Sequence, residues 1–461
     1  MCRLERGFNV FMEAFSQFVG HVDSMIWSMV LVLLCLGVGL YLSIRMKFPQ
    51  IRFLKEMVHL LGAKEESENG ITPFQAFATT VGARVGMGNI AGVASAIYFG
   101  GPGSVFWMWI MAVLGSATAF IEATLAQLYK EKDPLYGGYR GGPAYYIHRF
   151  FERKEGRKKR YVLPAVLFAI SGLICWCGIS QVISNSVSES FNNAFNIPPL
   201  YTTIALVILA AVIVLRKNAT VKVLDVLVPV MAVLYFVITL IIIGMNITAL
   251  PGVFQRIFEE AFGIRQFAGG SFGAILMNGV KRGLFSNEAG SGSAPCAAAA
   301  AEGKTPVTMG LVQSLGVFID TIVICSCTAF IMLLVPQEVT DGLSGMALLQ
   351  TAMEFHLGRF GVIFIAVTLA MFSFSTFLGI LFYARSNVAY LFGDKWCWQM
   401  AYKVLALVML FIGGIAAYTF VWDLGDVGIG LMTLFNISIL YPLSKEAFQA
   451  LGQYEKKKAE K

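Results

Sequence analysis

The sequence has few charged residues for its length. Only 14% of its 461 residues are Asp, Glu, Lys or Arg, whereas 57% are hydrophobic and the mean hydropathy is +0.70. A soluble protein of this size would need far more charge to cover its surface. Windows of about 20 apolar residues recur along the whole chain, which is typical of a protein that crosses a membrane many times.

Histidine is scarce, and the sequence motifs of enzymes and pumps are missing. There is no HExxH spacing, no GxxxxGK[ST] loop and no soluble domain of the kind that drives an ATP-dependent pump. Ser291 and Ser293 lack a nearby histidine that could act as their base. We therefore expect no enzyme and no organic cofactor, and an integral-membrane enzyme stays a remote alternative. All four histidines fall outside the apolar spans or near their ends: His21, His59, His148 and His356.

The eight cysteines form no metal-binding or disulfide pattern. Cys175 and Cys177 are two residues apart, as are Cys325 and Cys327, and residues at this spacing point to different faces of a helix. We interpret them as small packing residues.

Eleven membrane spans are predicted. The first is too long for the core of a signal peptide, so we expect it to be retained. Pro73 and Pro306 indicate helix starts, and the charged run 153–160 indicates a loop. The predicted spans are 25–44, 73–99, 103–129, 163–189, 200–215, 221–246, 271–302, 307–335, 359–383, 400–420 and 426–443.

Lysine and arginine are distributed very unevenly over the connections between these spans. One alternating set of connections, which includes the C-terminal tail, holds 27 of them and the opposite set holds 5. The positive-inside rule then places the C-terminus in the cytoplasm and the N-terminus outside, for a multi-pass protein of the cell membrane. The net charge of +7 is explained by this asymmetry, so we expect no nucleic-acid partner.

The last ten spans divide into two groups of five. Residues 1–72 hold an extra N-terminal span and a cytoplasmic linker, 73–246 the first repeat, 271–443 the second repeat, and 444–461 a cytoplasmic tail. Because each repeat has an odd number of spans, the second is inverted relative to the first. The expected fold is therefore an all-α polytopic membrane protein with a 5+5 inverted repeat.

Each repeat opens with an interrupted helix. "GARVGMGN" (82–89) lies inside the first, and a Gly-rich polar stretch (279–295) lies inside the second. Non-helical backbone in a bilayer is tolerated where it lines a wet cavity, and matching breaks in two inverted halves indicate a secondary transporter's binding site. A dinucleotide fingerprint is disfavoured because no strand precedes it. Close helix packing is the alternative for the glycines, and we favour it for Gly92, Gly115 and Gly172.

The motifs "GARVGMGNIAG", "GGPGSVFWMW", "GGPAYYI" (141–147), "RGLFSNEAGSGSAP" (282–295) and "FSFSTFLG" (372–379) resemble those of the alanine-or-glycine:cation symporter family. The resemblance covers about residues 74–441. It implies the inverted-repeat fold of bacterial leucine transporters, with one extra helix in front. It also implies sodium-coupled import of a small neutral amino acid, alanine or glycine, by alternating access.

The resemblance also implies a sodium site. When the Gly86-x-Gly88-Asn89 core is matched to the corresponding motif of sodium-coupled leucine and neurotransmitter transporters, five groups take the places of the sodium ligands. They are the carbonyls of Gly82, Val85 and Phe372 and the hydroxyls of Ser375 and Thr376. Uncharged oxygens of this kind suit a hard cation. The alternative is that Ser375 and Thr376 bond back to carbonyls of their own helix.

A neutral amino acid needs donors for its carboxylate and acceptors for its ammonium group. The first break would supply backbone N–H groups and the second would supply carbonyls, with Asn89 and Asn287 either orienting the substrate or capping half-helices. Ile380 stands where family members often carry tryptophan, which suggests a roomier pocket, so a larger neutral amino acid such as glutamine remains open. The candidate substrate residues are Ala83, Gly86, Gly88, Asn89, Gln181, Phe285, Ser286, Asn287, Thr376 and Ile380.

We single out six charged residues that fall inside predicted spans. Such charges are costly, and usually pair or face a water-filled path. We expect some of them to form a cytoplasmic gate, and the alternative is that they form static pairs that fix helix register. A lesser alternative is that Arg84 binds the carboxylate of the substrate directly. The candidates are Arg84, Glu122, Lys281, Arg282, Glu288 and Asp320. Nothing in the sequence demands a partner chain, so we expect a monomer in the lipid bilayer.

Overall fold

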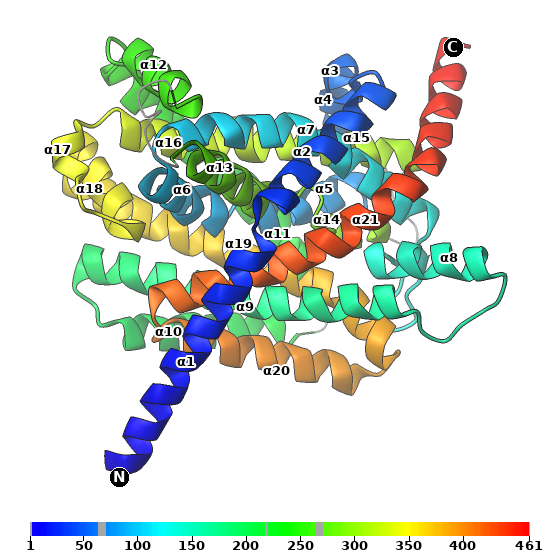
Figure 1. Cartoon of the computed structure of the whole chain (residues 1–461), viewed down its shortest axis with the longest axis horizontal. Helices are drawn as coiled ribbons and strands as arrows, with labels where there is room; N and C mark the ends of the chain where they lie inside the picture. The colour runs from blue at the N-terminus through cyan, green and yellow to red at the C-terminus, as the bar shows by residue number, and fades with distance from the viewer. Residues whose placement is uncertain (1, 63–70, 217–219, 264–270, 461) are drawn as a thin grey trace.

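The computed structural model describes residues 2–62, 71–216, 220–263 and 271–460, and these residues are almost entirely helical (Figure 1). Among them, the one sheet is a two-residue hairpin of β1 (Glu131–Lys132) and β2 (Tyr139–Arg140), in which Glu131 pairs with Arg140. The predicted all-α class is confirmed.

The helices lie in chain order over the two predicted groups of five, 73–246 and 271–443, a division that stays a prediction. The first group is α5 (Pro73–Arg84) with η1 (Gly88–Gly92) and α6 (Val93–Gly100), then α7 (Gly103–Leu128), α9 (Leu163–Phe195), α10 (Pro199–Val214) and α11 (Thr220–Met245). The second is α13 (Ser271–Asn287) with α14 (Ala294–Ala300), then α15 (Pro306–Val317) with η2 (Phe318–Cys325) and α16 (Ser326–Leu333), α19 (Arg359–Phe392), α20 (Trp396–Gly413) and α21 (Tyr418–Ala459). Shorter helices connect them: α3 (Pro49–Arg52), α4 (Leu54–Gly62), α8 (Pro143–Glu155), α12 (Leu250–Ala261), α17 (Gln337–Thr340) and α18 (Gly345–Leu357).

The N-terminal segment is longer than the single predicted span 25–44. It consists of α1 (Cys2–Ile26) and α2 (Met29–Arg45), which are bent by 42° relative to each other. At the bend the indole Nε1 of the buried Trp27 donates to the carbonyl of Asp426 in α21 at 2.9 Å. Packing against a distant helix therefore sets this bend, and no local pattern in the sequence signals it.

Length and composition alone do not recover all eleven predicted spans. Six described helices are long and apolar enough to cross a membrane, or up to eight if each of two bent pairs is counted as one span. α10 is a shorter apolar helix. The two interrupted helices fail it because each half is short. The exact number of spans stays a prediction.

Both interruptions are present, but each is shorter than predicted, because regular helix is lost only at Val85 and Gly86 in the first and α13 stays helical up to Asn287 in the second. α5 begins where expected, at Pro73, with a capping box formed by Thr72 and Gln75, and it ends at Arg84. In the second repeat, helix is lost from Glu288 to Ser293. Within that stretch φ is +54° at Glu288 and is also positive at Gly290 and Gly292.

The two ends of the molecule carry different connecting helices. In Figure 1, α8 lies at the right and α17 and α18 lie at the left. In the predicted orientation the α8 end faces the cytoplasm and the α18 end faces outside. No observation on the structure tests that assignment of sides.

Candidate functional site

Five oxygens from α5 and α19 lie close together at the end of α5. The hydroxyl of Ser375 donates to the carbonyl of Gly82 at 2.9 Å and to the carbonyl of Phe372 at 2.8 Å, and Thr376 donates to the carbonyl of Ala83 at 3.1 Å. The bond to Phe372 is the back-bonding that the sequence also allowed, but Gly82 belongs to another repeat. Four of the five predicted sodium ligands therefore lie together here, and sodium binding by them stays a prediction. Val85 follows at the break and leaves helical geometry with ψ of +84°.

Gly86 lies directly against Thr376 and the carbonyl of Phe372. A Cβ atom at Gly86 would lie 1.7 Å from Oγ1 of Thr376. A Cβ atom at Gly88 would lie 3.1 Å from Cα of Ser286. The first break therefore touches both α19 and the end of α13, so the candidate sodium residues lie next to both interrupted helices.

Asn89 caps the first break. Its Oδ1 accepts from the backbone N–H of Gly86 at 2.8 Å, and its Nδ2 donates to the carboxylate of Asp320 at 2.8 Å. Of the two roles left open from the sequence, capping is therefore observed. Because the N–H of Gly86 is already bonded, it is not free to hold a substrate carboxylate in this form of the protein.

Asn287 has the same role in the second break. Its Oδ1 accepts from the N–H of Ala289 at 3.0 Å, and its Nδ2 donates to the hydroxyl of Thr321 at 3.1 Å. Asp320 and Thr321 are neighbours in η2, a π-helical segment inside an otherwise α-helical span. π-Bulges are frequent at functional sites, and this one joins the caps of both breaks.

Asp320 collects hydrogen bonds from several elements. Besides Asn89, the hydroxyls of Ser286 (2.9 Å) and Thr321 (2.8 Å) donate to its carboxylate. Cys325 also contacts this cluster, with its Sγ 3.2 Å from Nδ2 of Asn89 and 3.2 Å from Oγ of Ser286. The interpretation of Cys325 as a packing residue is therefore incomplete, because its sulfur takes part in the polar network.

Glu122 of α7 holds the second break. Its carboxylate accepts from the N–H of Gly290 at 3.0 Å and from the side-chain amide of Asn436 in α21. The same amide donates to the carbonyl of Gly290 at 2.9 Å, and the hydroxyl of Tyr146 in α8 donates to Oδ1 of Asn436. This network ties the break to the α8 end of the molecule.

Lys281 and Arg282 pair with acids outside the predicted set of six. Arg282 makes a bidentate pair with Asp426 of α21 at 2.9 Å, and Lys281 lies 2.7 Å from Asp23 and 2.8 Å from Asp426. Trp422 stacks under Arg282, with the guanidinium carbon 4.6 Å from the ring centre. Both basic residues precede the break in α13. They therefore lie in the half predicted to face outside and not at the predicted cytoplasmic end.

Other ion pairs lie near the α8 end. Arg385 of α19 contacts Asp133 at 3.2 Å and stacks on Tyr136 at 3.7 Å, and Arg140 pairs with Asp394. None of these residues was a gate candidate, because the sequence placed them in loops or at a span end.

Arg84 and Glu288 are buried beside the breaks. Arg84 is 1% exposed and donates to the carbonyl of Gln313 at 3.3 Å. Its Nε and Nη2, and one carboxylate oxygen of Glu288, have no hydrogen-bond partner in the described structure. No ion pair of Arg84 or Glu288 is observed among the described residues, so these two gate candidates are not part of an observed ion pair.

Two candidate substrate residues are not drawn into the contacts at the breaks. Gln181 points to α20, where its Nε2 lies 3.3 Å from Sδ of Met409. Ile380 is buried in α19, and no described polar contact connects it to either break. Phe285 does lie at the site, with its ring 5.3 Å from that of Trp422.

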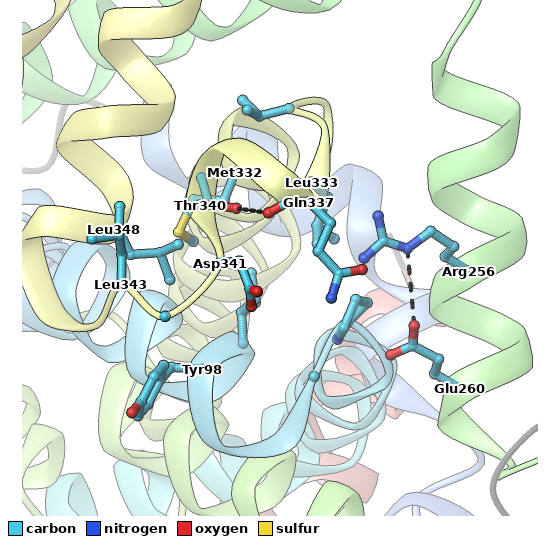
Figure 2. Close-up of a pocket in the computed structure, with 15 residues that line it drawn as sticks. Tyr98, Arg256, Glu260, Met332, Leu333, Gln337, Thr340, Asp341, Leu343 and Leu348 are labelled. Atoms are coloured by element: carbon cyan, nitrogen blue, oxygen red, sulfur yellow. Dashed lines mark hydrogen bonds and ion pairs between the residues drawn. The ribbon is translucent and has the colours of Figure 1, made fainter.

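A surface cleft of about 450 Å³ lies away from this site, between α6, α12 and the α16–α18 segment. Figure 2 shows Arg256 and Glu260 on one wall and Asp341 and Leu343 on the other. No candidate substrate or sodium residue lines it. The residues around the two breaks are instead almost fully buried, so this form of the protein shields them from solvent.

Four residues that contact the candidate site were not among the residues predicted from the sequence: Asp23, Thr321, Asp426 and Asn436. A signal existed for Asp426, an acidic residue at the edge of a predicted span. The other three could not be found without knowing which helices pack together.

An all-helical membrane protein whose two interrupted helices meet at its centre has the architecture of a secondary transporter. The profile of the sodium:alanine symporter family matches residues 12–461, so the chain belongs to that family. Family membership confirms the resemblance that the motifs indicated.

Three curated relatives illustrate the similarity. The chain is 44% identical to the Bacillus subtilis protein named "Probable sodium/glutamine symporter GlnT", over 95% of this chain and 91% of that protein. It is 39% identical to the "Amino-acid carrier protein AlsT" of B. subtilis (97% and 94% covered). It is 36% identical to the "Sodium/alanine symporter AgcS" of Methanococcus maripaludis (96% and 100% covered).

Among solved structures, the chain is similar to a Na⁺-coupled sialic acid symporter, with 12% identity, a TM-score of 0.49 and coverage of 87% of this chain and 81% of that one. The family assignment rests on the sequence match and not on this distant likeness.

Proposed function

We propose that the protein is a sodium-coupled symporter that imports a small neutral amino acid by alternating access. The observation that carries the proposal is the meeting of Gly82, Phe372 and Ser375 oxygens beside the first break. Neutral oxygens from two repeats can bind sodium only when both repeats are in place, so that ion binding is linked to the closed arrangement.

The substrate would bind where the two breaks touch. Gly88 against Ser286 brings backbone from both interrupted helices within contact distance. Free N–H groups at the start of a half-helix favour a carboxylate, and carbonyls at the end of the other favour an ammonium group. Membership of the sodium:alanine symporter family favours a small neutral amino acid, alanine or glycine. Glutamine is the second candidate, because the relative with 44% identity is named for it and Ile380 replaces a tryptophan that family members often carry.

Two layers of ion pairs would close the site at opposite ends. The Arg282–Asp426 layer, with Lys281 and Asp23, would close the outer side, and the Arg385–Asp133 contact would close the cytoplasmic side. We keep the predicted N-out, C-in orientation in the cell membrane and a monomer as the working unit.

Uptake into proteoliposomes tests the proposal. Labelled alanine, glycine and glutamine would be offered to the purified protein with and without an inward sodium gradient. We expect one of them to accumulate only with the gradient, and Thr376→Ala to abolish accumulation.

Accumulation of glutamine alone would replace the first substrate assignment with the second. Equal uptake with and without sodium would contradict the coupling. Chemical conversion of the solute would instead identify the remote enzyme alternative.

A further inference from the structure

Buried acidic and basic side chains do not balance around the two breaks. Glu122, Glu288 and Asp320 are each at most 3% exposed, and all three interact electrostatically with the same cation, Arg84. The other two basic residues in this part of the protein do not neutralise these three acids. Lys281 and Arg282 are held by Asp23 and Asp426. If all three acids were ionised, the interior would hold two uncompensated negative charges, which is very costly away from water.

The three carboxyl groups differ in how well their ionised forms are stabilised. Asp320 accepts hydrogen bonds from Asn89, Ser286 and Thr321, and Glu122 accepts them from Gly290 and Asn436. Donors of this kind stabilise a carboxylate. Glu288, in contrast, faces the hydroxyl of Tyr383 as a neighbouring donor, and its Oε2 has no hydrogen-bond partner in the described structure. Glu288 is therefore the acid that gains least from being ionised.

The groups facing Glu288 come from six elements, and Arg84 of α5 is the one cation among those described. The other neighbours are neutral or acidic: Glu122 of α7, Cys175 of α9, Cys296 of α14, Asp320 of η2 and Tyr383 of α19. Two neighbouring carboxylates thus oppose the single guanidinium, which donates to the carbonyl of Gln313 and forms no ion pair with Glu288 among the described contacts. A neutral carboxyl group suits these surroundings better than a charged one.

The backbone of Glu288 adds a second, independent indication. The residue has φ of +54°, a conformation that non-glycine residues rarely adopt, and it is the first residue after α13 ends. Strained positions of this kind cluster at ligand clamps and switch regions. Glu288 is therefore placed where a movement of the half-helices would change its surroundings.

We propose that Glu288 is a proton-binding site that controls closure of the transport site, an inference that rests on the proposed symport function. While the site is closed, Glu288 carries its proton. When one side opens to water, the O–H bond breaks, the proton passes to water and the carboxylate is hydrated. Closure requires a proton from water on the open side to return to the same oxygen. Transport consequently slows as pH rises.

The test compares sodium-driven uptake by the wild type and Glu288→Gln between about pH 6 and about pH 9, a range that buried glutamates reach. The glutamine side chain imitates the neutral acid. We expect wild-type uptake to fall at alkaline pH, by up to about tenfold per pH unit because the protonated fraction falls by that factor. Glu288→Gln should be nearly independent of pH and faster than the wild type at the alkaline end.

Glu189→Gln is the matched control. Glu189 is a partly buried glutamate of α9 whose carboxylate accepts from the N–H of Met346 at 3.1 Å, away from the breaks. This variant should keep the wild-type pH dependence. The same slope for the wild type, Glu288→Gln and Glu189→Gln would overturn the proposal.

Thermal stability at about pH 7 provides a second readout if Glu288→Gln transports poorly. A neutral Glu288 predicts that the variant melts at the wild-type temperature or above it. Melting clearly below the wild type, with Glu189→Gln unaffected, would mean that an ionised Glu288 stabilises the closed form, and would overturn the proposal. Sodium-dependent uptake by the wild type tests the symport function separately, so the two failures are distinguishable.

Discussion

Gly86 leaves no room for a side chain, since a Cβ atom there would lie 1.7 Å from Oγ1 of Thr376. We therefore expect Gly86→Ala to push α5 and α19 apart and to abolish sodium-dependent uptake. Gly92 is the control in the same interrupted helix, because the nearest atom to its added Cβ would lie 3.9 Å away. Gly92→Ala should retain most of the uptake. Loss of uptake in both variants would mean that this helix tolerates no added side chain at either glycine, and would contradict a specific role of the contact between Gly86 and Thr376.

Ser375 is the hydroxyl on which the sodium assignment depends. Ser375→Ala removes one oxygen next to the carbonyls of Gly82 and Phe372. Because a hydrogen bond or ligand contact to a charged group contributes about 1.5–3 kcal/mol, the sodium concentration for half-maximal uptake should rise by about tenfold or more. Sodium titration of alanine and glutamine uptake measures this.

Ser373→Ala is the matched control for that titration. Ser373 is equally buried in α19, but its hydroxyl has no hydrogen-bond partner in the described structure. An unchanged sodium dependence in Ser375→Ala would mean that Ser375 is not a sodium ligand and that its hydroxyl only bonds back to a carbonyl of its own helix.

At the scale of elements, η2 connects the two interrupted helices. Asn89 bonds the N–H of Gly86 and the carboxylate of Asp320, and Asn287 bonds Thr321. Asn89→Ala would leave buried groups unpaired on both sides. We expect it to destabilise the protein by about 1–3 kcal/mol and to lower uptake strongly.

Thermal unfolding in detergent, read beside uptake, measures both effects. Asn193→Ala removes an asparagine that bonds Gln350 far from the breaks, and should leave uptake near the wild-type level. Normal uptake by Asn89→Ala would mean that the connection through η2 is dispensable.

The elements that were predictable from the sequence are those that local chemistry specifies. Pro73 and its capping residues start α5, and glycine-rich polar stretches inside apolar runs indicated both breaks. Ser375 opposite Gly82 was predictable through the family motif. The π-helical form of η2 was not, because it depends on hydrogen bonds to Asn89 and Asn287 from other helices. The partners of Lys281 and Arg282 were missed for the same reason, since α1 and α21 meet α13 only in the folded protein.

At the scale of the whole molecule, ion pairs at opposite ends should govern which side is open. Arg282 and Lys281 converge on Asp426 at one end, and Arg385 meets Asp133 near the α8 end. Asp426→Asn leaves two basic side chains without their shared carboxylate, and we expect this to favour opening at the predicted outer end. Asp133→Asn should favour opening at the other end, because Arg385 then loses its acidic partner.

Accessibility of one introduced cysteine distinguishes these two states. Phe285→Cys, in a background without native cysteines, places a thiol next to the Arg282 layer. Phe285 itself is only 6% exposed in the parent structure. A membrane-impermeant thiol reagent added outside should label it faster in Asp426→Asn and no faster in Asp133→Asn. The reverse pattern would show that the predicted orientation is inverted. Both ion pairs would then act as gates, but each on the opposite side of the membrane from the one predicted. Equal labelling in both variants and in the parent would mean that these pairs fix helix register and do not act as gates.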